Sequence, residues 1–278
     1  MNRWKDKYRW LERFILEKGV GGVVIAFSGG VDSSTLTAVT YRLLGDRVVA
    51  VTASSPTYPP EELEEAKQVA SEIGVKHMVL ESDELSIEEF CRNPENRCYY
   101  CKGHLLNRLL GVAEELGFKV VFEGTNLSDL NGHRPGFQAV VERANVFSPW
   151  VEARFTKEEV RALAKKLGLS VADKPSYACL SSRIPFGERI TEDKLRRAWM
   201  AERAVKSLTG ARQVRVRDHD SLARIEVDEK ERRLFFSEDV MDKVASELKR
   251  LGFKYVTVDL EGYRSGSMLH ALKWEKVN

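Results

Sequence analysis

Four short runs of apolar, often β-branched residues recur along the first half of the chain, separated by segments of helical periodicity. The runs are VVIAF at 23–27, RVVAVTA at 47–53, HMVLES at 77–82 and KVVFEG at 119–124. Between the first two runs, Leu36, Val39 and Leu43 share one helical face, and a glycine follows as a stop. Strands that are apolar on both faces and alternate with helices are typical of a parallel sheet covered on both sides. The first half is therefore predicted to be α/β, with a doubly wound parallel sheet.

The pattern changes in the second half. A capping box of Thr156 and Glu159 opens one more helix, and then the segment 170–190, SVADKPSYACLSSRIPFGERI, predicts a long loop with two prolines. After it come a helix from Thr191, strict alternation in QVRVR and ARIEV, a helix to about Arg250 and a strand KYVTVDL. Alternation indicates strands buried on one face only. We expect two domains, residues 1–190 and a smaller α+β unit at 191–278 for substrate binding or oligomerisation.

Composition excludes several partners. The 44 basic and 42 acidic side chains of the 278 residues leave a formal charge of +2, so no global field attracts nucleic acid. The longest apolar runs fall far short of the roughly 18 residues that signal a membrane span. The first residues, MNRWKDKYRWLERF, are charged and amphipathic, which predicts a helix rather than a signal peptide and favours a cytoplasmic location.

The stretch AFSGGVDSS at 26–34 follows an apolar strand and precedes a helix, an arrangement that points backbone N–H groups at an anion. Gly29 and Gly30 permit close approach. The hydroxyl donors are Ser28, Ser33 and Ser34. The lysine-bearing phosphate loop and the dinucleotide fingerprint are both absent. Asp32 would repel a bare phosphate but becomes useful if Mg²⁺ bridges it to phosphate oxygens. An ordinary Ser/Gly turn capped by Asp32 is the alternative.

Further polar positions follow other predicted strands. Ser54 follows the second strand, and EGTNLSDL at 123–130 follows the fourth. The latter contributes Gly124, Thr125, Asn126 and Asp129. Because the carboxyl ends of parallel strands meet at one edge of a sheet, these residues are candidates for the same nucleotide site. Turn and helix-cap duty is the alternative for Asn126 and Asp129.

Four cysteines in a long chain indicate metal or redox chemistry rather than a disulfide scaffold. Cys98 and Cys101 form RCYYCK, a C-x₂-C pair suited to zinc or an iron–sulfur cluster, and Cys179 lies in the irregular loop. Arg97 and Lys102 flank the pair and would help lower the thiol pKa values. If these three cysteines alone hold a four-iron cluster, one iron keeps an open position that could carry sulfide.

A zinc site is the alternative to the cluster, because Cys91 could be a fourth ligand and His104 extends the pattern to C-x₂-C-x₂-H. Cys91 as a small buried residue and His104 on a helix surface are the alternatives for these two positions.

Two pairs in the second half are candidates for substrate binding. Arg215 and Arg217 occupy alternate positions of a strand, so both could grip a mononucleotide phosphate from one side of the sheet. A solvated polar strand face is the alternative. Ser182 and Arg183 adjoin Cys179 and could orient a substrate carboxylate, although a loop arginine can equally make a surface ion pair.

The motif S-G-G-x-D-S at 28–33 resembles the PP-loop of the ATP pyrophosphatase superfamily, which includes GMP synthetases, NAD synthetases and tRNA-thiolating enzymes. In those relatives the loop holds the pyrophosphate leaving group while the α-phosphorus is attacked, which implies cleavage of ATP to AMP and pyrophosphate. With RCYYCK, EGTNLSDL, ACLSSRIPFG, RVRDHD, ARIEV and LEGYRSGSM, the chain resembles the LarE family of sulfur transferases. That family converts pyridinium-3,5-biscarboxylic acid mononucleotide into its bisthiocarboxylic form during assembly of the nickel-pincer nucleotide cofactor.

The resemblance implies roles for the matching residues. The expected catalytic residues are Asp32, Lys102 and Cys179. The expected cofactor-binding residues, for ATP with Mg²⁺, are Ala26, Ser28, Gly29, Gly30, Asp32, Ser33, Ser34, Ser54, Arg97, Gly124, Thr125, Asn126 and Asp129. A 4Fe-4S cluster on Cys98, Cys101 and Cys179 would carry the sulfide donor, whereas relatives with one cysteine at the position of Cys179 surrender its sulfur and are left with dehydroalanine.

The family also implies a homo-oligomer, with a hexamer as one candidate form. The sequence does not give the sulfide source. Two other functions stay open. A tRNA-thiolating enzyme is disfavoured by the nearly neutral composition, and a nucleotide sensor with a structural zinc would release no pyrophosphate.

Overall fold

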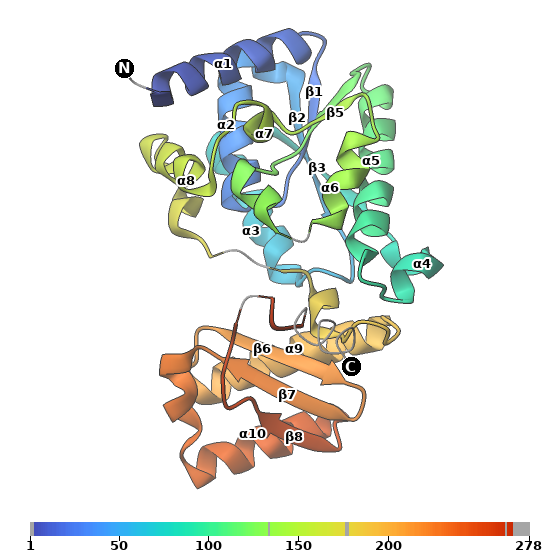
Figure 1. Cartoon of the computed structure of the whole chain (residues 1–278), viewed down its shortest axis with the longest axis vertical. Helices are drawn as coiled ribbons and strands as arrows, with labels where there is room; N and C mark the ends of the chain where they lie inside the picture. The colour runs from blue at the N-terminus through green and yellow to red at the C-terminus, as the bar shows by residue number, and fades with distance from the viewer. Residues whose placement is uncertain (1–2, 133, 176–177, 265, 269–278) are drawn as a thin grey trace. The chain divides into compact units, whose positions relative to one another are not determined.

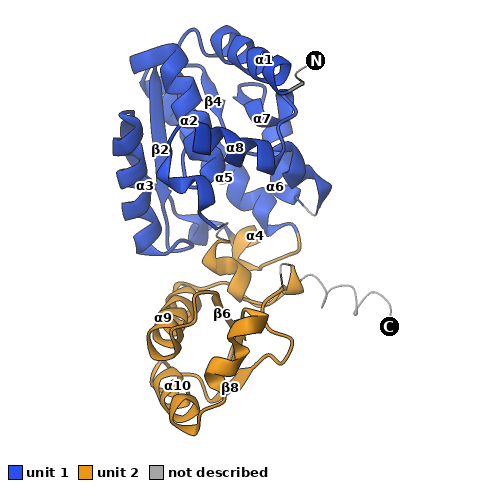
Figure 2. Ribbon diagram, turned by 90° about the vertical axis from the view of Figure 1, so that its left-hand side faces the viewer, with its two compact units in different colours: residues 1–87, 96–177 blue, residues 88–95, 178–278 orange. Residues whose placement is uncertain are grey.

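The structure is a computed structural model that describes residues 3–132, 134–175, 178–264 and 266–268. The chain forms two compact units, Met1–Ile87 with Asn96–Tyr177 and Glu88–Glu95 with Ala178–Asn278 (Figure 2). The units thus divide near residue 177 rather than at the expected position 190. The segment 88–95 joins the second unit because the Asn93 amide donates to the carbonyls of Ile184 (3.3 Å) and Pro185 (2.6 Å).

The first unit contains a five-stranded parallel sheet of order β3-β2-β1-β4-β5 (Figure 1). Its strands are β1 (Val23–Ala26), β2 (Val48–Ser54), β3 (Lys76–Glu81), β4 (Val120–Phe122) and β5 (Val146–Phe147). The four strands expected from the apolar runs are confirmed. The fifth was not expected, since two residues are too few to show any periodicity.

Helices cover both faces of this sheet (Figure 1). They are α1 (Arg3–Lys18), α2 (Val31–Leu44), α3 (Pro60–Ile73), α5 (Arg97–Glu115), α6 (Pro135–Val141), α7 (Pro149–Glu152) and α8 (Lys157–Lys166), with short η1 (Gly45–Arg47), η2 (Glu84–Ser86), η3 (Leu127–Asn131) and η4 (Ser170–Asp173). Val23 and Ile25 of β1 face the apolar cluster beneath α1, α2 and α8, while Val24 faces the cluster beneath α5 and α6. Alternate residues of one strand are thus buried on opposite faces, which confirms the α/β prediction.

The second unit has a three-stranded sheet of order β6-β7-β8, in which β6 and β7 are antiparallel and β7 and β8 are parallel. Its elements are α4 (Glu88–Cys91), η5 (Leu180–Arg183), α9 (Glu192–Thr209), β6 (Val214–His219), β7 (Leu222–Val227), η6 (Glu229–Phe235), α10 (Glu238–Arg250) and β8 (Tyr255–Val258). α9 and α10 pack against the sheet around a second core. The smaller mixed unit expected from the alternation is confirmed.

The expectation of one-faced burial is wrong for β6. Arg215 and Arg217 are 4% and 5% exposed, and the valines between and beside them are fully buried. The solvated polar face considered for these arginines is therefore also wrong. Polar side chains that are buried on a strand must find partners, and those partners are described below.

The segment 170–190 is largely irregular, as expected, and contains only the short helices η4 and η5. Ser176 and Tyr177 of this loop lie outside the described residues. None of the helices in the described part of the chain has the length and apolar character that a membrane crossing requires.

Candidate active site

The two loops expected to bind nucleotide meet where the strand order reverses. The chain proceeds from β1 to β2 and β3 on one side and then returns to β4 and β5 on the other, so ligands are expected beyond the carboxyl ends of β1 and β4. The Asn126 amide, after β4, donates to the Asp32 carboxylate in the first turn of α2, at 3.0 Å. A Cβ on Gly124 would lie 3.0 Å from the Ser33 backbone nitrogen, so the second loop packs directly on the first.

The loop after β1 has the geometry of an anion cradle. Gly29 has a φ of +65°, and a Cβ there would lie 2.7 Å from the Ala66 Cα on α3. Gly30 caps α2 and brings no side chain to the N–H groups of the first turn, which lack intrahelical partners. The hydroxyls of Ser28 and Ser33 lie 3.1 Å apart, and the latter also accepts from the Ser28 N–H at 3.2 Å.

The remaining loop residues differ in their surroundings. Ala26 ends β1, and Ser54 ends the neighbouring β2, where its carbonyl accepts from the Ser82 N–H at 2.8 Å. Ser34, expected as a third hydroxyl donor, has a buried hydroxyl that meets no hydrogen-bond partner among the described residues.

Asp32 lies in a charged environment that the sequence did not reveal. Its carboxylate forms an ion pair with Lys157, the first residue of α8, and its carbonyl accepts from the Trp150 indole at 3.1 Å. Burial raises the pKa of Asp32 and the Asp129 charge adds to this, while the hydrogen bond and charge of Lys157 oppose it. A second lysine, Lys174, donates to the Gly29 carbonyl at 3.2 Å. Two ammonium groups therefore reach a loop that has none of its own.

Asn126 links two carboxylates. Its amide nitrogen lies 2.7 Å from the Asp129 carboxylate as well as 3.0 Å from that of Asp32. Its side-chain oxygen accepts from the Asp129 N–H, and together they form a capping box on η3. The helix-cap alternative for these residues is confirmed. The same cap places an amide and a carboxylate beside Asp32.

Lys102 reaches the second loop through a carboxylate that sequence reasoning missed. Its ammonium lies 2.8 Å from Glu123, which is 1% exposed and also accepts from the Thr125 hydroxyl (2.7 Å) and from Ser148. Burial alone would raise the pKa of Glu123, but the charge of Lys102 and the three side-chain hydrogen bonds lower it overall. The sequence pattern did not assign Glu123 to the site, because this residue stands at the end of the predicted strand KVVFEG.

Cys98 and Cys101 lie near the start of α5, three residues apart and hence on one face of the helix. Cys98 is exposed and Cys101 is half-buried, while Arg97 beside them is buried. Among the described residues no group of three or more His, Cys, Asp or Glu side chains lies close enough to hold a metal ion. Cys179 belongs to the second unit.

The other two candidates for zinc binding are placed by the structure as follows. Cys91 is buried in α4 of the second unit, and His104 is half-buried on α5 rather than on an open surface.

In the second unit, Cys179 precedes η5, and Arg183 in that helix is 2% exposed. The Arg183 guanidinium bonds both oxygens of Glu202 on α9 (2.7 and 3.0 Å) and donates to the Cys179 carbonyl (3.1 Å) and the Ser182 hydroxyl (2.9 Å). Arg183 thus fixes the backbone at the cysteine and is not a surface ion pair.

The two β6 arginines have different partners. Arg217 pairs with Glu226 at 2.6 Å and donates to the Ser182 carbonyl at 2.9 Å, which brings β6 to the cysteine loop. Arg215 donates to the carbonyl of its neighbour Val214 and stacks on the Tyr263 ring, 5.4 Å from its centre. Burial lowers the pKa of Arg215, and the nearby Arg183 charge adds to this effect.

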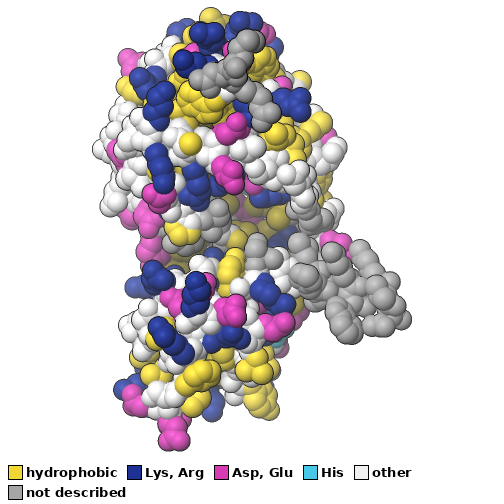
Figure 3. Space-filling model, turned by 60° about the vertical axis from the view of Figure 1, so that its left-hand side comes forward, with side chains coloured by type: hydrophobic (Ala, Val, Ile, Leu, Met, Phe, Trp, Pro, Cys, Tyr) yellow, Lys and Arg dark blue, Asp and Glu magenta, His cyan; other side chains and the backbone are white. Residues whose placement is uncertain are grey.

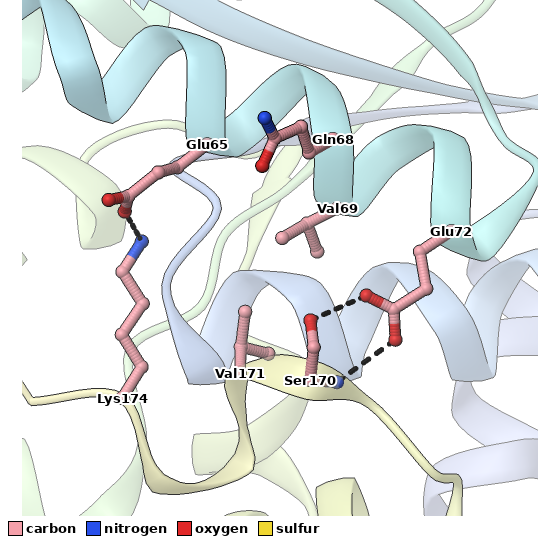
Figure 4. Close-up of a pocket in the computed structure, with 7 residues that line it drawn as sticks. All are labelled: Glu65, Gln68, Val69, Glu72, Ser170, Val171 and Lys174. Atoms are coloured by element: carbon pink, nitrogen blue, oxygen red, sulfur yellow. Dashed lines mark hydrogen bonds and ion pairs between the residues drawn. The ribbon is translucent and has the colours of Figure 1, made fainter.

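A cavity adjoins the first loop between α3 and η4 (Figure 4). It is lined by Glu65, Gln68, Val69, Glu72, Ser170, Val171 and Lys174. Its charges are already paired, since Lys174 lies 2.6 Å from Glu65, and the Ser170 N–H donates to Glu72 at 2.9 Å. These contacts fasten η4 to α3 and hold Lys174 beside the loop.

Comparison with known proteins agrees with this geometry. The chain is 38% identical over 252 residues, 90% of each chain, to the pyridinium-3,5-bisthiocarboxylic acid mononucleotide synthase of Lactiplantibacillus plantarum. The chain belongs to the LarE family. It is also 44% identical over 249 residues, 90% of this chain and 92% of the relative, to an uncharacterized protein of Synechocystis.

Two further similarities cover part of the LarE-family chain. Residues 3–100 match the family model described as NAD synthase. The tRNA-specific 2-thiouridylase of Rickettsia typhi is 28% identical over 55% of this chain and 52% of its own length. The resemblance stated from the motifs is confirmed, and this LarE-family chain is an ATP-dependent enzyme of the PP-loop class.

Proposed function

We propose that the chain is a sulfur transferase that acts on pyridinium-3,5-biscarboxylic acid mononucleotide. A substrate carboxylate oxygen attacks the α-phosphorus of ATP, the bond to pyrophosphate breaks, and an acyl adenylate forms. A sulfur nucleophile then attacks the acyl carbon, and AMP leaves with the former carboxylate oxygen. The observation that carries the proposal is the contact of Asn126 with Asp32 at the switch point, in a chain that matches the synthase over 90% of its length.

The first unit supplies the groups that ATP and Mg²⁺ need. Backbone N–H groups at the start of α2 and the hydroxyls of Ser28 and Ser33 suit the leaving pyrophosphate. Mg²⁺ prefers a few carboxylate oxygens together with phosphate oxygens. Asp32 and Asp129, held on either side of the Asn126 amide, fit that donor set.

The cysteines suit a 4Fe-4S cluster. Two thiols on one face near the start of α5 match a C-x₂-C pair, and the positive end of a helix stabilises nearby thiolates. Cys98, Cys101 and Cys179 would hold the cluster, and when bound it would supply an iron with an open position for the sulfide that is transferred. The alternative is direct loss of the Cys179 sulfur.

The substrate phosphate is assigned to β6. Arg215 is buried, with the Glu202 charge nearby, and it donates to a backbone carbonyl and lies over an aromatic ring. A phosphate would give its guanidinium a charged hydrogen-bond acceptor. Arg217 and Arg183 position Ser182 and Cys179 on the same side of the unit. Ser182 is assigned to orienting the substrate carboxylate.

The second unit also supports a homo-oligomer. The family resemblance implies this assembly, and Phe236, Tyr255 and Leu260, which are 83%, 64% and 84% exposed, are candidates for its covered surface. Light scattering of the full chain tests this proposal. A monomeric mass at all protein concentrations would refute it.

The function is tested with the pyridinium substrate, ATP, Mg²⁺ and sulfide, following pyrophosphate release and thiocarboxylate formation by mass spectrometry. Asp32→Asn should abolish pyrophosphate release, and the exposed Asp46→Asn is the matched control. Release that depends on tRNA instead would favour the thiouridylase alternative. That alternative is weakened by a match to only about half of those enzymes and by the mixture of acidic and basic side chains on the face in Figure 3.

The cluster is tested separately by anaerobic purification, absorption spectroscopy and iron analysis. A colourless, iron-free protein under those conditions would exclude the cluster. Conversion of Cys179 to dehydroalanine during turnover would then identify the cysteine as the sulfur donor.

A further inference from the structure

We propose that one face of the β6–β7 hairpin holds a carboxylate subsite, where Arg217 and Arg224 bind the ring carboxylate of the substrate that is not being activated. The inference rests on the proposed function. The pyridinium ring carries two carboxylates, and only one of them is adenylated at a time. The other enters the site as an anion, and burial of an unpaired anion is costly. Arg215 is assigned to the phosphate, so the second carboxylate needs a partner of its own.

Arg217 and Arg224 oppose each other on the polar face of the hairpin. The neighbouring residues Val216 and Ile225 are paired in register and belong to the core beneath α9 and α10. Because side chains alternate along a strand, Arg217 and Arg224, which are also paired in register, point to the opposite face. Facing side chains of antiparallel strands have Cβ atoms about 5 Å apart, and like charges there are destabilising. The pair therefore needs anions nearby.

The chain supplies two carboxylates to this pair. Glu226 is fully buried and lies 2.6 Å from an Arg217 nitrogen and 3.0 Å from an Arg224 nitrogen. Asp259 lies 3.7 Å from Arg224. The Ser182 carbonyl accepts from Arg217 at 2.9 Å. All of these contacts use the terminal Nη atoms, so the two guanidinium groups are held at one end and their charges are balanced.

The inner nitrogens of the two arginines differ from the terminal ones. Each Nε is buried and meets no hydrogen-bond acceptor within the part of the chain that the structure describes. The Nε2 atom of His219, two positions further along β6, is in the same condition. Burial lowers the pKa of His219, and the charges of Arg224 and Arg217 add to this effect, so the three side chains form one cluster. A buried N–H without an acceptor costs about 1–3 kcal/mol, and native structures rarely leave one. The cluster thus offers donors to an acceptor that the described residues do not provide.

A carboxylate fits this cluster better than a phosphate. Two Nε–H donors match the two oxygens of one carboxylate. Since Glu226 and Asp259 already balance the two arginine charges, the cluster suits a monoanion rather than a phosphate dianion. The Arg224 side chain is 32% exposed, so a ligand can reach it. Arg217 also holds the backbone of Ser182, the residue assigned to the reacting carboxylate, which brings both carboxylate positions to the same part of the unit.

The first test is binding to the full chain without ATP, measured by titration calorimetry with two ligands. One is pyridinium-3,5-biscarboxylic acid mononucleotide, and the other is pyridinium-3-carboxamide mononucleotide, which keeps the ring and the phosphate but has no carboxylate. Arg224→Met should weaken binding of the first ligand about 10- to 100-fold, as expected for loss of a charge-assisted hydrogen bond, and leave binding of the second unchanged.

Arg232→Met is the matched control, because Arg232 lies on η6 of the same unit, is also 32% exposed and pairs with Glu229. It should change neither affinity. Equal weakening of both ligands by Arg224→Met would assign Arg224 to the phosphate or ribose, and no weakening of either would leave it without a role, so both results overturn the proposal. Circular dichroism verifies folding. If Arg224→Met does not fold, Arg224→Lys, which keeps the charge and loses the Nε–H, takes its place with the same two ligands.

A second test separates the non-reacting carboxylate from the reacting one. A contact with the non-reacting group is the same before and during adenylation, so Arg224→Met should raise KM for the biscarboxylic substrate about 10- to 100-fold and leave kcat for pyrophosphate release unchanged. A fall in kcat at unchanged KM would show that Arg224 acts on the reacting carboxylate, and it would contradict the proposal.

The two proposals fail in different ways. A wild-type chain that binds the biscarboxylic ligand through Arg224 but releases no pyrophosphate with it refutes the proposed function and supports the subsite. Turnover of that substrate with kcat and KM unchanged by Arg224→Met supports the function and refutes the subsite. A wild-type chain that binds neither ligand refutes both.

Discussion

Replacement of Gly29 by alanine tests whether the phosphate loop depends on a glycine at its closest approach to α3. Gly29 has a φ of +65°, a conformation that costs a residue with a side chain about 1–2 kcal/mol. The new Cβ would also lie 2.7 Å from the Ala66 Cα and 3.1 Å from its nitrogen. These are backbone atoms that cannot rotate away, and overpacking of this kind costs about 1–3 kcal/mol.

The two effects together predict that Gly29→Ala lowers the free energy of unfolding by about 2–5 kcal/mol. Gly117→Ala is the control, since Gly117 has a φ of +72° and a Cβ there would meet no described atom within 4 Å. It should lose only the conformational part, about 1–2 kcal/mol. Urea unfolding followed by circular dichroism measures both changes, and Mg-pyrophosphate affinity should fall only for Gly29→Ala. Equal destabilisation of the two variants would refute the close packing of the loop on α3.

Three further predictions follow from buried charges. Glu202→Gln should destabilise the second unit by about 3–5 kcal/mol, measured by urea unfolding, because it removes the buried negative charge that pairs with Arg183. Because the pKa of Asp32 is raised in the folded state, its contribution to stability is present below the unfolded pKa and is lost as pH rises through the folded pKa. Asp32→Asn should therefore be at least as stable as wild type at neutral pH. Thermal unfolding should show that this advantage of the variant disappears in acid. The pKa of Glu123 is lowered, so the pH dependence is opposite: its contribution to stability is present above the unfolded pKa and is lost as pH falls through the folded pKa. Glu123→Gln should remove this acid sensitivity. It should also slow pyrophosphate release, because Lys102 loses the carboxylate that holds it.

The sequence predicted the parts of the fold that are encoded by local periodicity. The first four strands, the start of α8 at Thr156 and the end of α2 at Gly45 each carry a pattern within a few residues. β5 has only two residues and owes its existence to pairing with β4, which no local pattern shows. The burial of Arg215 and Arg217 could not be predicted from the sequence either. The alternation along β6 is the same whether its polar face contacts water or buried partners such as Glu226.

The same limit applied to the candidate site. Gly29, Asp32 and Asn126 stand in motifs whose spacing can be read directly, and the structure brings them together. Lys157 lies inside the capping box of Thr156 and Glu159, and Glu123 opens EGTNLSDL, but neither pattern predicts the contacts of these two residues. Lys157 meets Asp32, and Glu123 meets Lys102, only through long-range packing. Residues that act on a motif from a distant helix are therefore the ones that sequence reasoning misses.

The topology explains how an amide and an ammonium group reach a loop that has no lysine of its own. Because the strand order reverses between β1 and β4, the chain passes the loop twice more after leaving it, once at Asn126 and again at the start of α8. Each later passage adds a group that the loop lacks, an amide between two carboxylates and then an ammonium. The ammonium is that of Lys157, which pairs with Asp32. The charge of the carboxylate in the loop is thus met by a residue 125 positions further along the chain.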